Sequence, residues 1–159
     1  ERYATAAQAI EDLYRAFYSG QSDIRGKIFI SYARKNSDYV HALAQELVSI
    51  GLDIWIDQAI EPGSNWDNSI ETALNECDKL LLIASEASMQ SSNVQNEWSY
   101  FLELGKPVFT FLYEPCELSF RLRRRQYISS TGDMLSDIAH IVNVLAGGNP
   151  TPFNATADA

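Results

Sequence analysis

The chain has 159 residues, of which 46% are hydrophobic and 21% are charged, proportions that are typical of a globular domain and exclude a disordered chain. Its formal net charge of −9 argues against nucleic-acid binding as the main activity, because such proteins need a positive field. No stretch approaches the ~20 apolar residues of a membrane segment, and two scattered cysteines fit a reducing, cytoplasmic setting.

Three local features bear on cofactors and partners. Cys77 and Cys116 form no CxxC pair, and two histidines cannot complete a structural zinc site, so we expect no metal cofactor. The basic run at residues 121–125 is expected to be a solvated loop, with an anion or partner patch as the alternative. The chain begins at Glu1 without a methionine, which suggests a segment of a longer protein whose other domains are its partners.

An amphipathic helix is expected near the start of the chain. Apolar side chains recur at helical spacing within residues 4–18, and a turn-forming sequence follows them. This helix lies outside the repeating pattern that follows. Residues 1–24 are therefore expected to be an accessory helix or the end of a preceding domain.

Strands and helices then alternate along the chain. Apolar runs predict strands at residues 27–32, 53–57, 80–84, 108–112 and 127–129. Amphipathic stretches predict helices at 37–50, 66–77, 91–104 and 134–145, whereas 58–65, 85–90 and 115–126 are expected to be loops or irregular. Short connections of this kind predict an α/β fold, a flavodoxin-like, doubly wound parallel sheet of about five strands with helices on both faces. It would occupy residues 25–148, followed by a flexible tail at 149–159.

The carboxyl ends of parallel strands are where ligands collect in such sheets. Here those ends are followed by residues 31–35, 57–65 and 85–90. The helix at 91–104 begins at the same edge. The sequence therefore predicts one crevice, walled by these three loops and by Glu97.

Glu97 occupies an unusual position on its helix. Val94, Trp98, Phe101 and Leu102 form one apolar stripe, and the serines before them can cap the helix. Glu97 lies one residue before Trp98, so its carboxylate leaves the helix at the edge of the buried face. A carboxylate placed there has either a basic partner or a ligand in a pocket.

Five short sequence motifs lie one after another between residues 27 and about 147. They are Phe29-Ile30-Ser31-Tyr32 with Arg34; Leu47, Gly51 and Trp55-Ile56-Asp57; Gly63-x-x-Trp66 with Ile70 and Ala73-Leu74; Leu80-Leu81-Leu82-Ile83-Ala84-Ser85; and Ser92-x-Val94-x-x-Glu97-Trp98 followed by Gly105-Lys106-Pro107-Val108. Together they resemble a TIR (Toll/interleukin-1 receptor/resistance) domain, and among TIR domains they are most similar to microbial members.

The resemblance implies an activity. TIR domains that hydrolyse NAD+ carry a glutamate at the position of Glu97, and scaffolding members commonly lack it. The chain is therefore expected to be a NAD+ nucleosidase that releases nicotinamide and forms ADP-ribose or a cyclic isomer. Family behaviour also implies a homo-oligomer or filament, in which residues 58–65 of one subunit close the site of the next, within a defence or signalling protein. The alternative is a non-catalytic module for TIR–TIR contacts.

A single carboxylate is sufficient for this chemistry. Cleavage of the nicotinamide–ribose bond passes through an oxocarbenium-like state, as in glycoside hydrolysis. Nicotinamide leaves as a neutral molecule from a cationic precursor, so no general acid is needed. A free glutamate, with a pKa of about 4.3, is ionised at neutral pH and can stabilise the positive charge on the ribose.

Substrate-binding positions are also implied by the resemblance. Ser31, Tyr32, Ala33 and Arg34 would line the crevice, and Arg34 would meet the pyrophosphate or a neighbouring subunit.

Three further positions leave alternatives open. Asp57 is either a ribose contact or a cap of its loop, and ordinary turn chemistry favours the cap. Trp66 either shields a ring of the substrate or packs in the core, which is the commoner role for such an aromatic residue. Asn93 stands where many active relatives carry tryptophan, four residues before the glutamate, so the affinity for the base is expected to differ.

Overall fold

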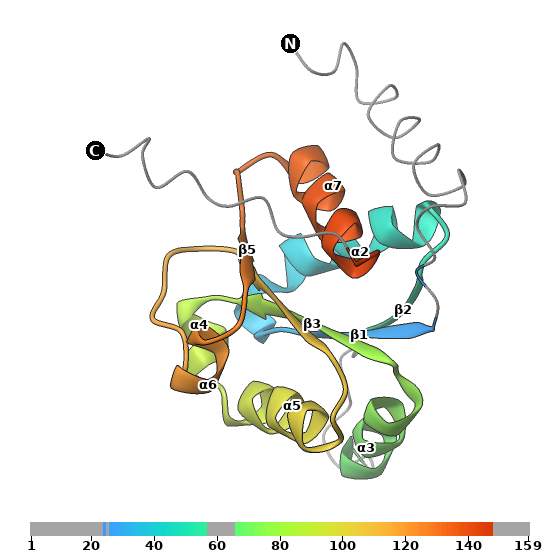
Figure 1. Cartoon of the computed structure of the whole chain (residues 1–159), viewed down its shortest axis with the longest axis vertical. Helices are drawn as coiled ribbons and strands as arrows, with labels where there is room; N and C mark the ends of the chain where they lie inside the picture. Colours follow the sequence, from blue (N-terminus) through green and yellow to red (C-terminus); the bar gives the residue numbers. More distant parts are fainter. Residues whose placement is uncertain (1–23, 25, 57–65, 148–159) are drawn as a thin grey trace.

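Five parallel strands form the centre of the molecule, as seen in a computed structural model that describes residues 24, 26–56 and 66–147, with the backbone alone for 66–68. The strands are β1 (Lys27–Ser31), β2 (Asp53–Ile56), β3 (Lys79–Ala84), β4 (Val108–Leu112) and β5 (Tyr127–Ser129). Their order in the sheet is β2-β1-β3-β4-β5, and every neighbouring pair is parallel (Figure 1). The predicted parallel sheet is confirmed.

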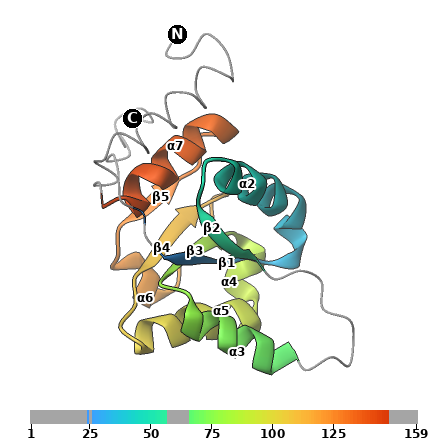
Figure 2. The ribbon, with the colours of Figure 1, turned by 90° about the vertical axis from the view of Figure 1, so that its right-hand side faces the viewer.

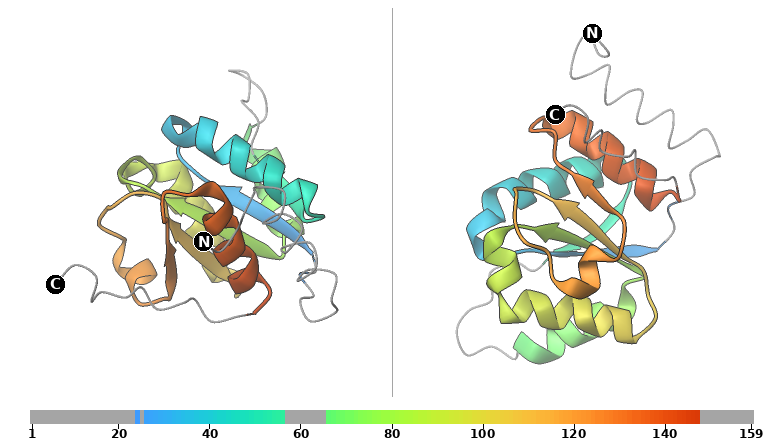
Figure 3. Two further views of the ribbon diagram at one scale, coloured as in Figure 1. Left: turned by 90° about the horizontal axis from the view of Figure 1, so that it is seen from above. Right: turned by 60° about the vertical axis from the view of Figure 1, so that its left-hand side comes forward.

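Helices cover both faces of this sheet. On one face lie α2 (Ser37–Ser49) and α7 (Met134–Leu145), and on the other lie α3 (Trp66–Glu76) and α5 (Ser92–Glu103) (Figures 2 and 3). Three short helices follow strands β1, β3 and β4: η1 (Arg34–Asn36), α4 (Glu86–Gln90) and α6 (Phe120–Arg123). None of the helices in the described ranges is long and apolar enough to cross a membrane.

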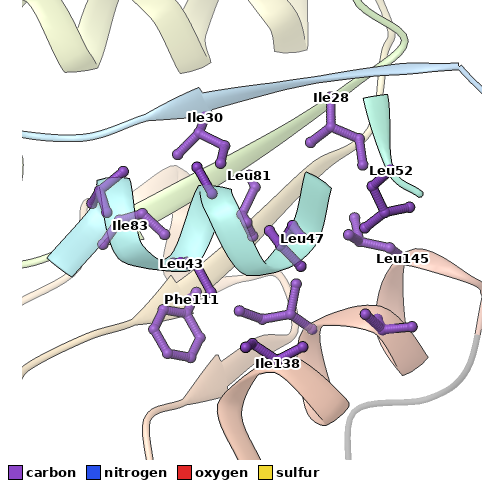
Figure 4. Packing of buried hydrophobic residues seen from close by; sticks show 14 of the residues in the cluster. Ile28, Ile30, Leu43, Leu47, Leu52, Leu81, Ile83, Phe111, Ile138 and Leu145 are labelled. Carbon is purple, nitrogen blue, oxygen red and sulfur yellow. The ribbon is translucent and has the colours of Figure 1, made fainter. Parts of the chain in front are cut away.

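Alternation along β1 directs its side chains to two separate cores. Ile28 and Ile30 pack with α2 and α7 on one side of the sheet (Figure 4). Phe29 packs on the other side, in the cluster formed with α3 and α5, and its ring stacks on Trp55 with centroids 4.7 Å apart. Because successive side chains alternate, Ser31 at the end of β1 faces the same side as Phe29. This is the side on which α5 lies.

The loop predicted at residues 85–90 is wrong, because it contains helix α4. Ser85 caps this helix: its side chain accepts a hydrogen bond from the Ser88 amide, and the Ser88 hydroxyl accepts one from the Ser85 amide. Five residues are too few for an apolar period to appear in the sequence. The basic run at 121–125, predicted as a loop, likewise contributes its first three residues to α6.

Several predictions concern segments outside the described residues. They are the helix at 4–18, the loop at 58–65 and the tail at 149–159. The domain boundaries at residues 25 and 148 therefore stay predictions.

Candidate functional site

Helix α5 presents Glu97 at the border of the core. Ser91 caps the helix by accepting a hydrogen bond from the Val94 amide at 3.3 Å. Val94, Trp98 and Phe101 are buried, and Trp98 exposes only 2% of its surface. Glu97, between them in sequence, is half-buried. The predicted apolar stripe, the serine cap and the position of the carboxylate at its edge are all found.

A side chain from strand β1 makes a hydrogen bond to this carboxylate. The Ser31 hydroxyl donates a hydrogen bond to Glu97 Oε1, with 3.0 Å between the oxygens. Ser31 is itself buried, with 1% of its surface exposed. A hydroxyl that donates to a carboxylate stabilises its ionised form and limits its rotation. Glu97 is therefore oriented by a side chain from the central strand, 66 residues away in sequence.

A hollow of about 480 Å³ opens beyond the carboxyl end of β1, with Glu97 in its wall. The loop after β1 contributes Tyr32, Ala33 and Arg34, and the hollow continues to Lys35 and His41. Arg34, Lys35 and His41 are exposed, and the Tyr32 hydroxyl lies 3.4 Å from His41 Nε2. The hollow therefore combines the Glu97 carboxylate with the positively charged side chains of Arg34 and Lys35 and with the His41 imidazole.

A second hollow, of about 250 Å³, lies between α3 and α5. Its apolar wall comes from Ile70, Leu74 and Tyr100. Its polar wall comes from Glu71 and Asn96, together with the Glu97 and Asn93 side chains that also line the first hollow. Glu97 therefore stands between two hollows of different character.

A buried polar contact joins two of the loops around the crevice. The Ser85 hydroxyl, after β3, donates to Asn36 Oδ1, after β1, at 2.7 Å. Both residues are buried. Asn36 occupies the N-cap position of α2, but its side chain makes no cap hydrogen bond there. The amide oxygen of its side chain instead accepts from Ser85, the N-cap residue of α4. No local sequence pattern indicates this role.

The structure brings most of the predicted site residues together. Tyr32, Ala33, Arg34, Asn93 and Glu97 all line the larger hollow. Ser31, predicted to line the crevice, lines neither hollow: it is buried, and its hydroxyl contacts the Glu97 carboxylate instead.

The other two predicted site residues cannot be placed. Asp57 lies outside the described residues, and Trp66 begins α3 with a side chain that is likewise outside them.

Sequence reasoning missed His41, Glu71 and Asn96. Each occupies an exposed helical position, so only the packing of neighbouring helices brings it to a hollow. Among the side chains that the structure describes, no cluster of three or more from His, Cys, Asp or Glu could hold a metal ion.

Comparisons with known proteins agree with this architecture. The chain is similar to the crystal structure of the TIR domain of the Toll-related receptor TRR-2 from Hydra magnipapillata, with a TM-score of 0.57 and 18% sequence identity. The similar region covers 64% of this chain and 82% of that one. At this identity the likeness shows the fold alone. No curated protein matches the chain. A family model described as TIR domain matches residues 28–142, and the chain therefore belongs to the TIR domain family.

Proposed function

We propose that the chain is a NAD+ nucleosidase that cleaves the bond between nicotinamide and ribose. The products are nicotinamide and ADP-ribose or a cyclic ADP-ribose isomer. The observation that carries this proposal is the half-buried carboxylate of Glu97, which is held by Ser31 and stands in the wall of two hollows. A carboxylate in this environment has both a fixed orientation and access to a ligand.

Glu97 acts by stabilising positive charge. The bond from the ribose C1′ to the ring nitrogen breaks, and its electron pair neutralises the pyridinium ring. C1′ and the ring oxygen of the ribose then share the positive charge, as in glycoside cleavage. The Glu97 carboxylate stabilises that charge because it is already oriented when the charge develops. In hydrolysis, water adds to C1′ and its proton passes to the solvent.

The cationic side of the larger hollow would bind the diphosphate. Arg34 and Lys35 are both exposed there and can each donate to phosphate oxygens. The guanidinium of Arg34 can contact two oxygens at once. Tyr32 and Ala33 line the same hollow.

Ser31 acts through Glu97 as a positioning residue. Its hydroxyl is buried and reaches the carboxylate, and Ser31 is not one of the residues that line either hollow. Ser31→Ala should therefore lower kcat and leave KM for NAD+ nearly unchanged. A loss of about tenfold corresponds to one lost hydrogen bond to a charged group.

The decisive experiment compares Glu97→Gln with the unchanged protein. Both are incubated with NAD+ at high protein concentration with a crowding agent, because the active form is proposed to be self-assembled, and nicotinamide is measured by chromatography. We expect a loss of at least about 100-fold in Glu97→Gln. Glu103→Gln, on an exposed position of the same helix, is the matched control and should retain full activity. Equal rates in all three proteins would remove Glu97 from the mechanism.

A second candidate function, assembly without catalysis, is favoured by one surface feature. Phe120 exposes 64% of its surface on α6, beside the exposed Arg121, Arg123 and Arg124. An aromatic residue among arginines is typical of protein interfaces. Light scattering on the same samples separates the two functions, because large particles without any nicotinamide release would favour a scaffold.

A further inference from the structure

The side chains around Glu97 are divided by charge. The larger hollow is lined by Arg34, Lys35 and His41, whose nitrogen groups can donate hydrogen bonds to a ligand. The smaller hollow carries Glu71 beside Glu97, and none of the described residues that line it is Lys, Arg or His. Glu97 belongs to both hollows. Its carboxylate therefore marks the boundary between a basic region and an acidic one.

The smaller hollow has the features of a site for a flat ring. Ile70 and Leu74 of α3 face Tyr100 of α5 across it, and its volume of about 250 Å³ has room for one substituted pyridine ring. Tyr100 is fixed in place, because its hydroxyl donates a hydrogen bond to Asn75 Oδ1 at 2.8 Å. The apolar part of the wall therefore comes from both helices, and this hydrogen bond connects them.

Polar groups sit at the rim of this apolar space. Glu71 contributes a carboxylate from α3, and Asn96 contributes an amide from α5, both on exposed positions. A carboxylate attracts a cationic ring and repels an anionic one. An asparagine amide can both donate to and accept from a carboxamide substituent.

We propose that the hollow between α3 and α5 is the leaving-group pocket and that Glu71 and Asn96 determine which base it accepts. The pocket takes a pyridinium cation with a neutral carboxamide and disfavours a base that carries a carboxylate. This inference rests on the proposed function, since a leaving group exists only if the bond to ribose is broken. It assigns the two hollows to the two differently charged parts of one substrate.

The role of Glu71 has a kinetic consequence. The pyridinium charge is present in bound NAD+ and is lost as the bond breaks, so Glu71 stabilises the bound substrate more than the transition state. Glu71→Gln should therefore raise KM for NAD+ about three- to fivefold without lowering kcat, a magnitude set by the exposure of its carboxylate. Glu76→Gln, on the same helix and also exposed, lines neither hollow and should leave both constants unchanged.

Direct binding tests the pocket without any turnover. The unchanged protein is titrated with 1-methylnicotinamide, nicotinamide and nicotinate, and NMR signals of Tyr100 are followed. We expect affinity to fall in that order. Asn96→Ala should weaken nicotinamide binding about five- to tenfold, whereas Gln95→Ala, the adjacent exposed amide that lines neither hollow, should not.

The outcomes separate this inference from the proposed function. Nicotinate binding as tightly as 1-methylnicotinamide, or Tyr100 signals that do not move, would overturn the pocket even if Glu97 drives NAD+ cleavage. The pocket would also be overturned if Glu71→Gln left KM for NAD+ unchanged and Asn96→Ala left nicotinamide binding unchanged. The expected order of binding in a protein that releases no nicotinamide would show that the hollow binds the base, but it would overturn the enzyme and, with it, the leaving-group role.

Discussion

The side chain of Lys106, which lies just before β4, caps the carboxyl-terminal end of helix α3. Its ammonium group donates to the carbonyl oxygens of Cys77 at 2.7 Å, Asn75 at 2.8 Å and Leu74 at 3.3 Å. The last carbonyls of a helix have no partner within it and carry the negative end of its dipole. Because Lys106 precedes β4, these hydrogen bonds connect α3 to that strand. Helix α5 packs in the same hydrophobic cluster. We predict that Lys106→Met destabilises the domain.

The expected loss of stability can be worked from these contacts. A hydrogen bond to a charged group contributes about 1.5–3 kcal/mol. The ammonium group also lies 5.3 Å from the centre of the Phe101 ring, a cation–π contact that adds about 0.5–1 kcal/mol. In the variant, water can reach some of the carbonyls, because Lys106 is only half-buried. We therefore expect a loss of about 2 kcal/mol.

Urea unfolding followed by circular dichroism measures this loss. With a urea dependence of about 2 kcal/mol per molar, the midpoint should fall by about 1 M. Lys35→Met removes the same charge at an exposed position and should stay within about 0.5 kcal/mol of the parent. Hydrogen exchange should also accelerate at the amide of Cys77. A midpoint unchanged in Lys106→Met, or lowered equally in both variants, would refute this role.

Two further predictions concern buried titratable groups. Asp137 is 1% exposed and accepts hydrogen bonds from the Thr131 amide at 2.7 Å, the Ser130 hydroxyl at 2.7 Å and the Thr131 hydroxyl at 2.9 Å. Asp137→Ala leaves these donors without an acceptor and should cost about 3 kcal/mol in urea unfolding, and Asp137→Asn clearly less; equal losses would contradict a role for the charge. Burial raises the pKa of the Cys77 thiol to about 11 from its ordinary value of 9.0. Between pH 9 and pH 11 the thiol is therefore largely ionised in the unfolded chain and still protonated in the folded one. Because the unfolded chain then binds fewer protons, the free energy of unfolding should fall as pH rises from 9 to 11. Cys77→Val should show a smaller fall, and an identical pH dependence in both proteins would refute the assignment.

The helices and strands could be predicted from the sequence wherever apolar residues recur with a regular spacing. Apolar runs and helical stripes indicated the five strands and the helices on both faces, because burial of one face imposes a period on the sequence. The stripe of Val94, Trp98 and Phe101 likewise indicated where the Glu97 carboxylate leaves α5. Helix α4 was missed because it is too short to show a period.

Contacts between distant segments were not predictable. The partner of Asn36 is Ser85, 49 residues away, and the partner of Tyr100 is Asn75, 25 residues away. Asn36 stands at the N-cap position of α2, where a local pattern favours a cap, but its side chain accepts a hydrogen bond from Ser85 instead. No sequence spacing encodes such a choice.

By itself, then, the sequence determined the parallel sheet, the crevice at the carboxyl ends of its strands and the carboxylate at its edge. The sheet and the place of the carboxylate follow from hydrophobic periodicity, which is a property of neighbouring residues, and the crevice follows from the parallel direction of the strands. Only the tertiary structure decided that Ser31 holds Glu97 and that α3 and α5 leave a second hollow beside it. The reason is physical: hydrogen bonds between elements and the space between helices depend on how separate segments pack, and the chain carries no local signal for either.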